Sequence, residues 1–355
     1  MGLLPSGPDP VGEEHVRANL PKGYMRILGL GCKGPRTMPP ELPPLPDAAR
    51  LAMPFEETAP GARSKEKPVA RRHPTPLRTS SEDIAASRKA PQTPQTQSAA
   101  YRLAFADDEF MTSEDTRGVR FQLEYLKPEL RLREHGITST VVLFGGARIP
   151  EPGKPAWAAK NETQKRNLEA ASRYYEEARR FAQLAAQTSA ATDFKEYVVV
   201  TGGGPGVMEA GNRGAADMGA PSIAFNIVLP HEQAPNLYVT PDLSFNFHYF
   251  ATRKIHFLLR AKAVAVFPGG FGTLDEFFET LTLIQTGRME RIPVLLFGQD
   301  FWTRVINLEA LAEAGTIAPT DPDLFTVVDT AQQGWDVVRQ RYNLPAIGEP
   351  VWRGG

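Results

Sequence analysis

The stretch from Ala263 to Glu276 constrains the fold of this chain more than any other part of the sequence. It begins with an apolar run, Ala263–Phe267, which has the composition of a strand buried on both faces of a parallel sheet. The run leads directly into Pro268–Thr273, whose sequence is PGGFGT. Apolar residues at three- and four-residue spacing follow, which predicts an amphipathic helix. The sequence therefore predicts a strand, a glycine-rich turn and a helix N-terminus in immediate succession.

This arrangement is typical of an anion-binding site. Unpaired amides at a helix N-terminus point outward, and the helix macrodipole favours negative charge there. Gly269, Gly270 and Gly272 allow the backbone to approach a phosphate without a Cβ in the way. Thr273 is expected to add a hydroxyl donor and to cap the helix, and Glu276 to lie about one turn further on. The pattern predicts a site that binds the phosphate of a substrate and catalyses a reaction close to it. The alternative is a glycine-rich turn with a purely structural role.

Composition and charge exclude several classes of protein. The chain has 355 residues, of which 41% are hydrophobic, so it is long enough for a sizeable core. A net charge of −1 argues against a dedicated nucleic-acid binder. The single cysteine, Cys32, excludes an intramolecular disulfide framework, and no stretch approaches the roughly 18 apolar residues of a spanning helix. Because Met1–Lys22 also lacks a secretion signal, we expect a cytoplasmic protein with neither nucleic acid nor membrane as partner.

The chain divides into three segments that differ in composition and in their predicted secondary structure. Residues 1–100 are proline-rich and of low complexity, which predicts a disordered arm that is either a solvated tail or a regulatory tether. Residues 101–136 predict a helical layer, with Pro128 inside its last helix, that packs on the main domain. The positions expected to face that domain are Phe105, Phe110, Val119, Leu123, Leu126 and Leu130.

Residues 137–345 alternate between strand and helix patterns. Strands are expected at 140–144, 197–201, 222–227, 243–247, 263–267, 293–297 and 325–328. Helices are expected at 167–186, 207–218, 249–262, after Thr273, and at 301–313 and 332–342. Repeated strand–helix units predict an α/β fold with a doubly wound, mainly parallel sheet, which binds ligands at the carboxyl ends of its strands. The glycine turns after two of these strands should therefore share one crevice.

The second glycine turn, Gly202–Gly206, does not fit two common nucleotide motifs. As a dinucleotide fingerprint it would need a third glycine where Val207 stands, and the next strand ends without an acid for a ribose. No Gly-Lys-Ser/Thr follows, so it is not a P-loop either. NAD chemistry and ATP hydrolysis are therefore disfavoured. Met208, which follows this turn, either contacts a ligand or packs in the core.

A basic pair, Arg253-Lys254, is expected near the start of a helix. The two residues are adjacent, so only one easily faces a cleft, and arginine is the better bidentate partner for phosphate. A solvated surface pair is the alternative. His248 and His256 lack ligand spacing with other donors, so we expect no metal site.

These motifs together resemble the LOG (Lonely Guy) family, long described as lysine decarboxylase-like. The residues that carry the resemblance are Gly202–Glu209, Arg253-Lys254 and Pro268–Glu276. The resemblance covers roughly residues 138–342, and residues 107–134 and 226–238 look like the longer bacterial branch of that family. The first hundred residues have no counterpart in its short members.

The resemblance implies a cytoplasmic, Rossmann-like phosphoribohydrolase that forms a homodimer or higher homo-oligomer. Such enzymes hydrolyse the N-glycosidic bond of a nucleoside 5′-monophosphate, typically AMP or a cytokinin riboside monophosphate, without a cofactor. On the family's motif, Arg253 and Glu276 fall at the catalytic positions. The residues expected to bind substrate or its phosphate are Gly203, Gly204, Met208, Lys254, Gly269, Gly270, Gly272 and Thr273.

Alternatives remain open at the level of the sequence. A non-catalytic nucleotide or molybdenum-cofactor carrier could use the same fold, because fold does not fix function. An enzyme regulated through its N-terminal arm is a further possibility. Decarboxylation would require a pyridoxal-bound lysine, and Lys254 is the only lysine near the motif. Candidates for the base pocket are Met208, Arg148 and the loop 226–236, whereas Glu232 is not favoured as a second carboxylate.

Overall fold

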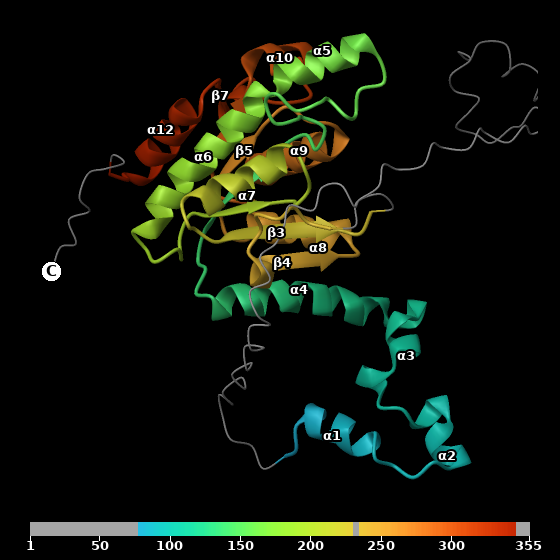
Figure 1. Cartoon of the computed structure of the whole chain (residues 1–355). Helices are drawn as coiled ribbons and strands as arrows, with labels where there is room; N and C mark the ends of the chain where they lie inside the picture. The colour runs from blue at the N-terminus through green and yellow to red at the C-terminus, as the bar shows by residue number, and fades with distance from the viewer. Residues whose placement is uncertain (1–76, 230–233, 346–355) are drawn as a thin grey trace, which may run out of the picture. The chain divides into compact units, whose positions relative to one another are not determined.

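The computed structural model describes residues 77–229 and 234–345. Its seven strands form one sheet in the order β4-β3-β2-β1-β5-β6-β7, and every neighbouring pair is parallel (Figure 1). The strands are β1 Thr140–Phe144, β2 Val198–Thr201, β3 Ser222–Ile227, β4 Ser244–Phe247, β5 Ala261–Val266, β6 Val294–Phe297 and β7 Thr326–Val328. The predicted doubly wound α/β sheet is confirmed.

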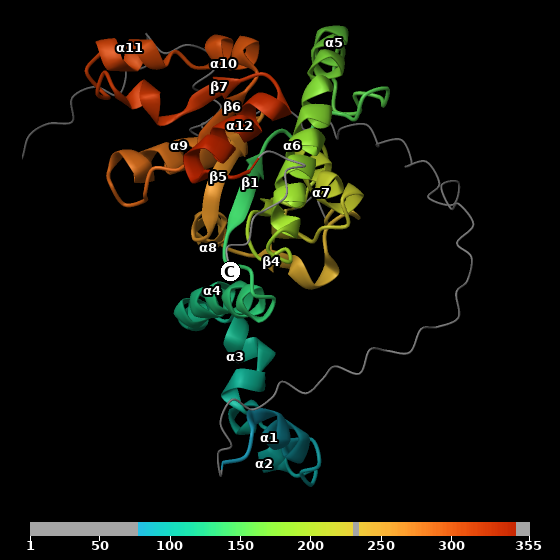
Figure 2. The ribbon, with the colours of Figure 1, turned by 90° about the vertical axis from the view of Figure 1, so that its left-hand side faces the viewer.

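Helices cover both faces of the sheet, which explains the unbroken apolar runs of the central strands. Alternate residues of β1 point to opposite faces: Val141 and Leu143 belong to one buried cluster, and Val142 and Phe144 to the other. The first face carries α6 (Arg173–Ala190), α7 (Val207–Asp217) and α12 (Ala331–Tyr342), and the second carries α8 (Phe250–Leu258) and α9 (Phe271–Gln285). Figure 2 shows α6 and α7 on one side of the strands and α8 and α9 on the other. No helix in the described ranges is long and apolar enough to cross a membrane.

Two helices expected from the sequence are each divided in the structure. The helix expected at 167–186 consists of α5 (Glu162–Ala171) and α6, and only α6 has buried residues. The helix expected at 301–313 consists of α10 (Gln299–Val305) and α11 (Leu308–Glu313). Asn307 causes the second division, because its side chain accepts a hydrogen bond from the Ala310 amide and starts a new helix.

Ordered elements also begin earlier than the composition suggested. Helix α1 (Ser80–Ser87) and the short α2 (Pro94–Gln97) lie in the segment expected to be disordered, and the rest of that segment, residues 1–76, is outside the described residues. Thr79 and Glu82 form a capping box at the start of α1, with the Thr79 amide 2.6 Å from the Glu82 carboxylate. Helix α3 (Asp108–Thr112) follows before α4 (Arg117–Glu134). The polar composition of the segment concealed this local capping signal.

Helix α4 packs on α8 through a face different from the one predicted. Val119, Leu123, Leu126 and Leu130 are 40–49% exposed, so the expectation that they face the main domain is wrong. An adjacent face of α4 makes the contact instead. On this face Phe121 stacks on Tyr249, with ring centroids 3.9 Å apart. The same side of α4 presents Glu124 to the start of α8, and this requirement fixes the rotation of the helix.

Glu124 accepts three hydrogen bonds at the start of α8. Its carboxylate lies 2.7 Å from the His248 amide, 3.2 Å from the Tyr249 amide and 2.7 Å from the Thr252 hydroxyl. It therefore caps α8 from another helix, at the N-terminus where a negative charge is favourable.

Replacing Glu124 should loosen the contact between α4 and α8. We expect Glu124→Ala to lower the free energy of unfolding by about 1–3 kcal/mol, because it removes the acceptor of two backbone amides and one of the two acceptors of the Thr252 hydroxyl. Glu134→Ala is the matched control on the same helix, where an exposed ion pair with Arg131 should contribute at most about 0.5 kcal/mol. Urea unfolding followed by circular dichroism measures both, and equal losses in the two variants would contradict the capping role.

Candidate functional site

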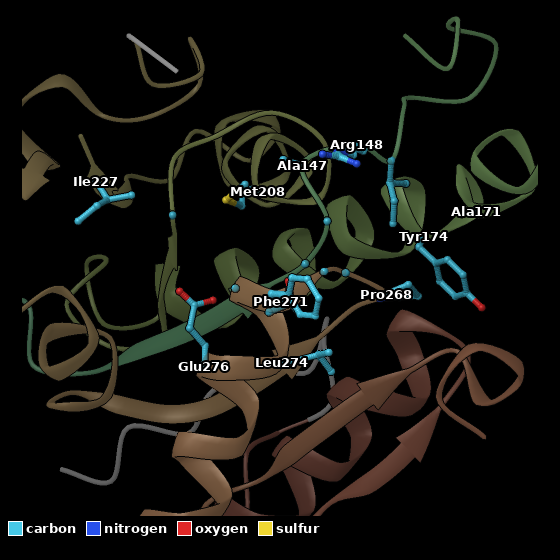
Figure 3. A pocket seen from close by; sticks show the side chains of 18 of the residues that line it. Ala147, Arg148, Ala171, Tyr174, Met208, Ile227, Pro268, Phe271, Leu274 and Glu276 are labelled. Carbon is cyan, nitrogen blue, oxygen red and sulfur yellow. The ribbon is translucent and has the colours of Figure 1, made fainter. Parts of the chain in front are cut away.

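A single large cavity runs along the carboxyl ends of the strands. Its volume is about 1560 Å³, and it is lined by the turns that follow β1, β2, β3, β5 and β6 (Figure 3). The order of the sheet reverses between β1 and β5, which lie at its centre. The cavity therefore lies where doubly wound sheets bind their ligands. Both glycine turns identified in the sequence contribute to it, through Gly202 on one side and Gly269 and Gly270 on the other.

The turn after β5 presents a helix N-terminus to the cavity. Gly270 is the N-cap of α9, and no side chain caps the first turn. Free amides at such a position can bind a phosphate. The expectation that Thr273 caps the helix is wrong, because the helix already begins at Phe271 and Thr273 is its third residue. The Thr273 side chain packs against Gly269 instead, where an added Cβ would lie 2.2 Å from its hydroxyl oxygen.

A third glycine turn, after β1, completes this part of the cavity. The Gly146 amide donates to the Pro268 carbonyl at 2.9 Å and so ties this turn to the phosphate loop. Gly206, which has a φ of +69°, packs directly on the same turn, since its Cβ would lie 2.5 Å from the Gly146 carbonyl oxygen. Three backbone segments therefore meet at distances that only glycine permits. The sequence analysis expected a strand to end at Phe144 and assigned no role to the two glycines that follow it.

An ion pair between Arg253 of α8 and Glu276 of α9 lies inside the cavity. Arg253 Nη1 is 3.2 Å from Glu276 Oε1, and the two side chains are only 10% and 12% exposed. Arg253 Nε also donates to the Phe225 carbonyl at 2.7 Å, which fixes the guanidinium between β3 and α9. Gly202 makes room for it, because a Cβ there would lie 2.6 Å from Nη2. The two residues that the resemblance placed at catalytic positions are thus held together. The sequence analysis placed Gly202 in the second glycine turn but did not foresee that it positions Arg253.

Burial changes the titration of Glu276. Loss of contact with water raises the pKa of its carboxyl group to about 7, although the positive charge of Arg253 acts in the opposite direction. Near neutral pH this carboxyl group is therefore present in both its protonated and its ionised form. A group poised in this way is suited to proton transfer or to stabilising a positive charge that forms during a reaction.

The other predicted site residues divide into two groups. Met208, Gly269, Gly270, Gly272 and Thr273 line the cavity together with Arg253 and Glu276. The remaining three do not line it; these are Gly203, Gly204 and Lys254.

Gly203 and Gly204 lie in the turn after β2, outside the cavity lining, and their carbonyls help to hold that turn in place. Asn236 donates from its side-chain amide to both of their carbonyls at 3.1 Å, and so holds the turn after β2. Lys254 points away from the cavity, where its ammonium group lies 3.3 Å from Asp275 and 3.1 Å from Glu279. The adjacent basic residues therefore have different environments, and only Arg253 faces the cavity.

Two residues of the cavity wall carry polar groups that a ligand could use. Asn226 lies at the end of β3, and its side-chain oxygen is buried without a hydrogen-bond partner among the described residues. Arg148 follows the turn after β1 and lines the cavity as well. Both belong to the segments proposed for the base pocket, whereas Glu232 lies outside the described residues. Among the described residues no cluster of three or more His, Cys, Asp or Glu side chains could hold a metal ion.

Comparison with protein families adds an independent observation. Residues 208–338 match the family described as "Possible lysine decarboxylase". This segment is therefore similar to the LOG family, which carries that description. It contains Arg253, Glu276 and the whole phosphate loop, so the resemblance seen in the sequence motifs is confirmed over this part of the chain.

Two molybdenum-cofactor proteins are among the solved structures to which this chain is similar. The molybdenum cofactor binding protein of Rippkaea orientalis is 18% identical, with a TM-score of 0.35 over 58% of this chain and 98% of that one. The molybdenum cofactor carrier protein of Chlamydomonas reinhardtii is 20% identical, with a TM-score of 0.35 over 58% of this chain and 99% of that one. A search of curated proteins found no match.

The phosphate loop offers a matched pair of glycine substitutions. We expect Gly269→Ala to lower the free energy of unfolding by about 1–3 kcal/mol, because its methyl group collides with Thr273. Gly272→Ala should change it by less than about 1 kcal/mol, since a Cβ there meets no atom within 4 Å. Urea unfolding of both variants tests the packing of the loop, and an equal loss of stability in the two would contradict it.

Proposed function

We propose that this protein hydrolyses the N-glycosidic bond of a nucleoside 5′-monophosphate to the free base and ribose 5-phosphate. The observation that carries the proposal is the buried Arg253–Glu276 pair, which shares one cavity with an uncapped helix N-terminus. A phosphate site beside a carboxyl group of raised pKa suits a reaction at the sugar of a nucleotide. The resemblance to the LOG family supports the same reaction class.

The parts of the cavity correspond to the parts of such a substrate. The 5′-phosphate binds at the first turn of α9, against the backbone of Gly269, Gly270 and Gly272. Glu276 lies further along α9, so the ribose extends over its carboxyl group. The base then lies toward Met208 and Asn226. Binding the phosphate firmly positions the sugar for reaction, and this is how remote binding energy lowers a barrier.

Glu276 and Arg253 act on opposite charges in the reaction. The bond between C1′ and the base nitrogen breaks, its electron pair leaves with the base, and positive charge develops on the ribose ring. The ionised Glu276 carboxylate accepts hydrogen bonds from ribose hydroxyls and stabilises that positive charge. Water attacks C1′, and the proton that it loses offsets the negative charge of the departing base. Arg253 supports the base or the phosphate, and its bond to Phe225 keeps it in place.

The cavity does not suit decarboxylation of an amino acid. That reaction needs a lysine to form a Schiff base with pyridoxal phosphate. No lysine lies among the described residues that line the cavity. Lys254, the nearest in sequence, is paired with Asp275 and Glu279 outside it.

We also infer that the protein functions as a homo-oligomer, as the family resemblance implies. The apolar stripe of α4 supports this inference, because Val119, Leu123, Leu126 and Leu130 are left exposed on a single chain.

The proposed reaction can be followed directly as base release. Wild-type protein incubated with AMP should release adenine, detected by chromatography, within a panel of nucleoside monophosphates that defines base preference. Glu276→Gln should lower the rate by at least about 100-fold while AMP binding, measured by calorimetry, is retained, because the side chain keeps its size and loses its charge.

Lys254→Gln is the matched control, because this neighbouring charge lies outside the cavity. We expect its rate to stay within about threefold of wild type. No base release from any nucleotide, despite measurable binding, would contradict the proposed reaction and favour a non-catalytic carrier.

A further inference from the structure

The cavity is larger than a mononucleotide requires. Its volume of about 1560 Å³ exceeds the roughly 300–1,000 Å³ of most small-molecule sites. It reaches from the end of β3 to the end of β6, which are four strand spacings apart in the sheet, or roughly 19 Å. The phosphate loop follows β5, inside this span, and does not mark its end. A nucleoside monophosphate that extends from the loop toward Met208 and Asn226 leaves the β6 side unfilled.

This β6 side of the cavity carries an excess of positive charge. Arg173 and Arg304 line the cavity from α6 and α10, and Arg148 lines it from the turn after β1, next to the phosphate loop; Asp300 is the acidic residue near them. Arg148 and Arg304 make no side-chain hydrogen bond or ion pair with another described residue. Arg173 lies 3.8 Å from Asp300, and both side chains are well exposed, at 61% and 89%. We call these four residues the arginine compartment.

The arginine compartment is separated from the reactive pair by the phosphate loop. Figure 3 shows Tyr174, the neighbour of Arg173, beyond Pro268 on the side away from Glu276, and Arg148 on the wall of the cavity that faces Phe271. The Glu276 side of the cavity has its charges paired, since Arg253 and Glu276 compensate one another. Arg173 donates to the Tyr174 hydroxyl at 2.8 Å and lies beside Asp300 of α10, the helix that carries Arg304 and follows β6. Arg173 and Arg304 therefore lie on the β6 side of the phosphate loop, away from the sugar.

We propose that the arginine compartment binds a second phosphoryl group, so that the protein takes nucleotides that carry a pyrophosphate. The inference rests on the proposed function, which places the first phosphate at the N-terminus of α9. Arginine is suited to this role because its guanidinium group binds phosphate oxygens in pairs. A phosphoryl group attached to the 5′-phosphate would leave the loop toward Arg148, and Arg173 and Arg304 would meet it from α6 and α10.

A comparison of the affinities for inorganic pyrophosphate and orthophosphate distinguishes binding in the arginine compartment from binding at the phosphate loop alone. Calorimetric titration of the full chain at low salt should give an affinity for pyrophosphate at least tenfold higher than for orthophosphate. The preference should fall at 0.5 M salt, because the arginines are exposed and their charges are screened. ADP should likewise bind more tightly than AMP.

One substitution in the arginine compartment should lower the affinity for pyrophosphate, and another should raise it. Arg304→Gln should lower it about tenfold, the loss expected when a charged partner of a phosphate is removed. Asp300→Asn should raise it severalfold, because it removes the negative charge that lies 3.8 Å from Arg173. A gain of this kind does not arise from misfolding. Arg288→Gln, an exposed arginine outside the cavity, is the matched control and should change neither affinity.

The outcomes distinguish this proposal from the proposed reaction. The proposed second phosphoryl site would be overturned if wild type bound the two anions equally or bound neither. It would also be overturned if the affinity for pyrophosphate did not respond to Arg304→Gln and Asp300→Asn. None of these results would contradict AMP hydrolysis. Selective pyrophosphate binding that responds to both variants would support the compartment even if no nucleotide releases its base.

Discussion

The buried side chain of Arg253 is the constraint on which the rest of the site depends. A cation removed from water is costly unless it is paired and hydrogen-bonded. Arg253 meets this requirement by reaching from α8 to the Phe225 carbonyl on β3 and to Glu276 on α9. One side chain thus joins three elements that are distant in the sequence. Its position also determines where the Glu276 carboxyl group lies.

The glycines around this pair are explained by the same requirement for space. Gly202 leaves room for the guanidinium group, and Gly206 and Gly146 allow two turns to touch through their backbones. Where these turns meet, the loop after β5 is held against the turn after β1, and its amides remain open to the cavity. The fold therefore supplies a phosphate site and a reactive carboxyl group from backbone geometry and one ion pair.

Much of this arrangement could be predicted from the sequence, because its signals are local. Apolar runs followed by glycines located the strands, and the PGGFGT turn located the helix N-terminus at the cavity. The inward face of α4 could not be predicted in this way, since hydrogen bonds that Glu124 accepts at the start of a distant helix decide its rotation. The same holds for Lys254, whose partners come from α9 and turn it out of the cavity. Contacts between distant segments override local patterns at both positions.

Thr273 shows a subtler limit. Its residue type and place in the motif favoured a helix cap, yet the extended backbone of Gly270 starts the helix three residues earlier. The arginine compartment was not foreseen either, because its residues come from segments after β1, from α6 and from α10, and no motif links them. Arg148 alone had been noted, as a candidate for the base pocket.

The pH dependence of AMP hydrolysis tests the central claim most directly, that Glu276 acts as an ionised carboxylate beside Arg253. Burial raises the pKa of Glu276 to about 7, so the carboxyl group is protonated below that pH and ionised above it. The rate at saturating AMP should therefore rise with pH through an apparent pKa near 7. In Arg253→Gln the rising limb should move to higher pH, because the neighbouring positive charge is lost, whereas a limb caused by the substrate phosphate would stay in place. A rate that is constant from about pH 5.5 to 8.5, or a limb that Arg253→Gln leaves unmoved, would contradict the account.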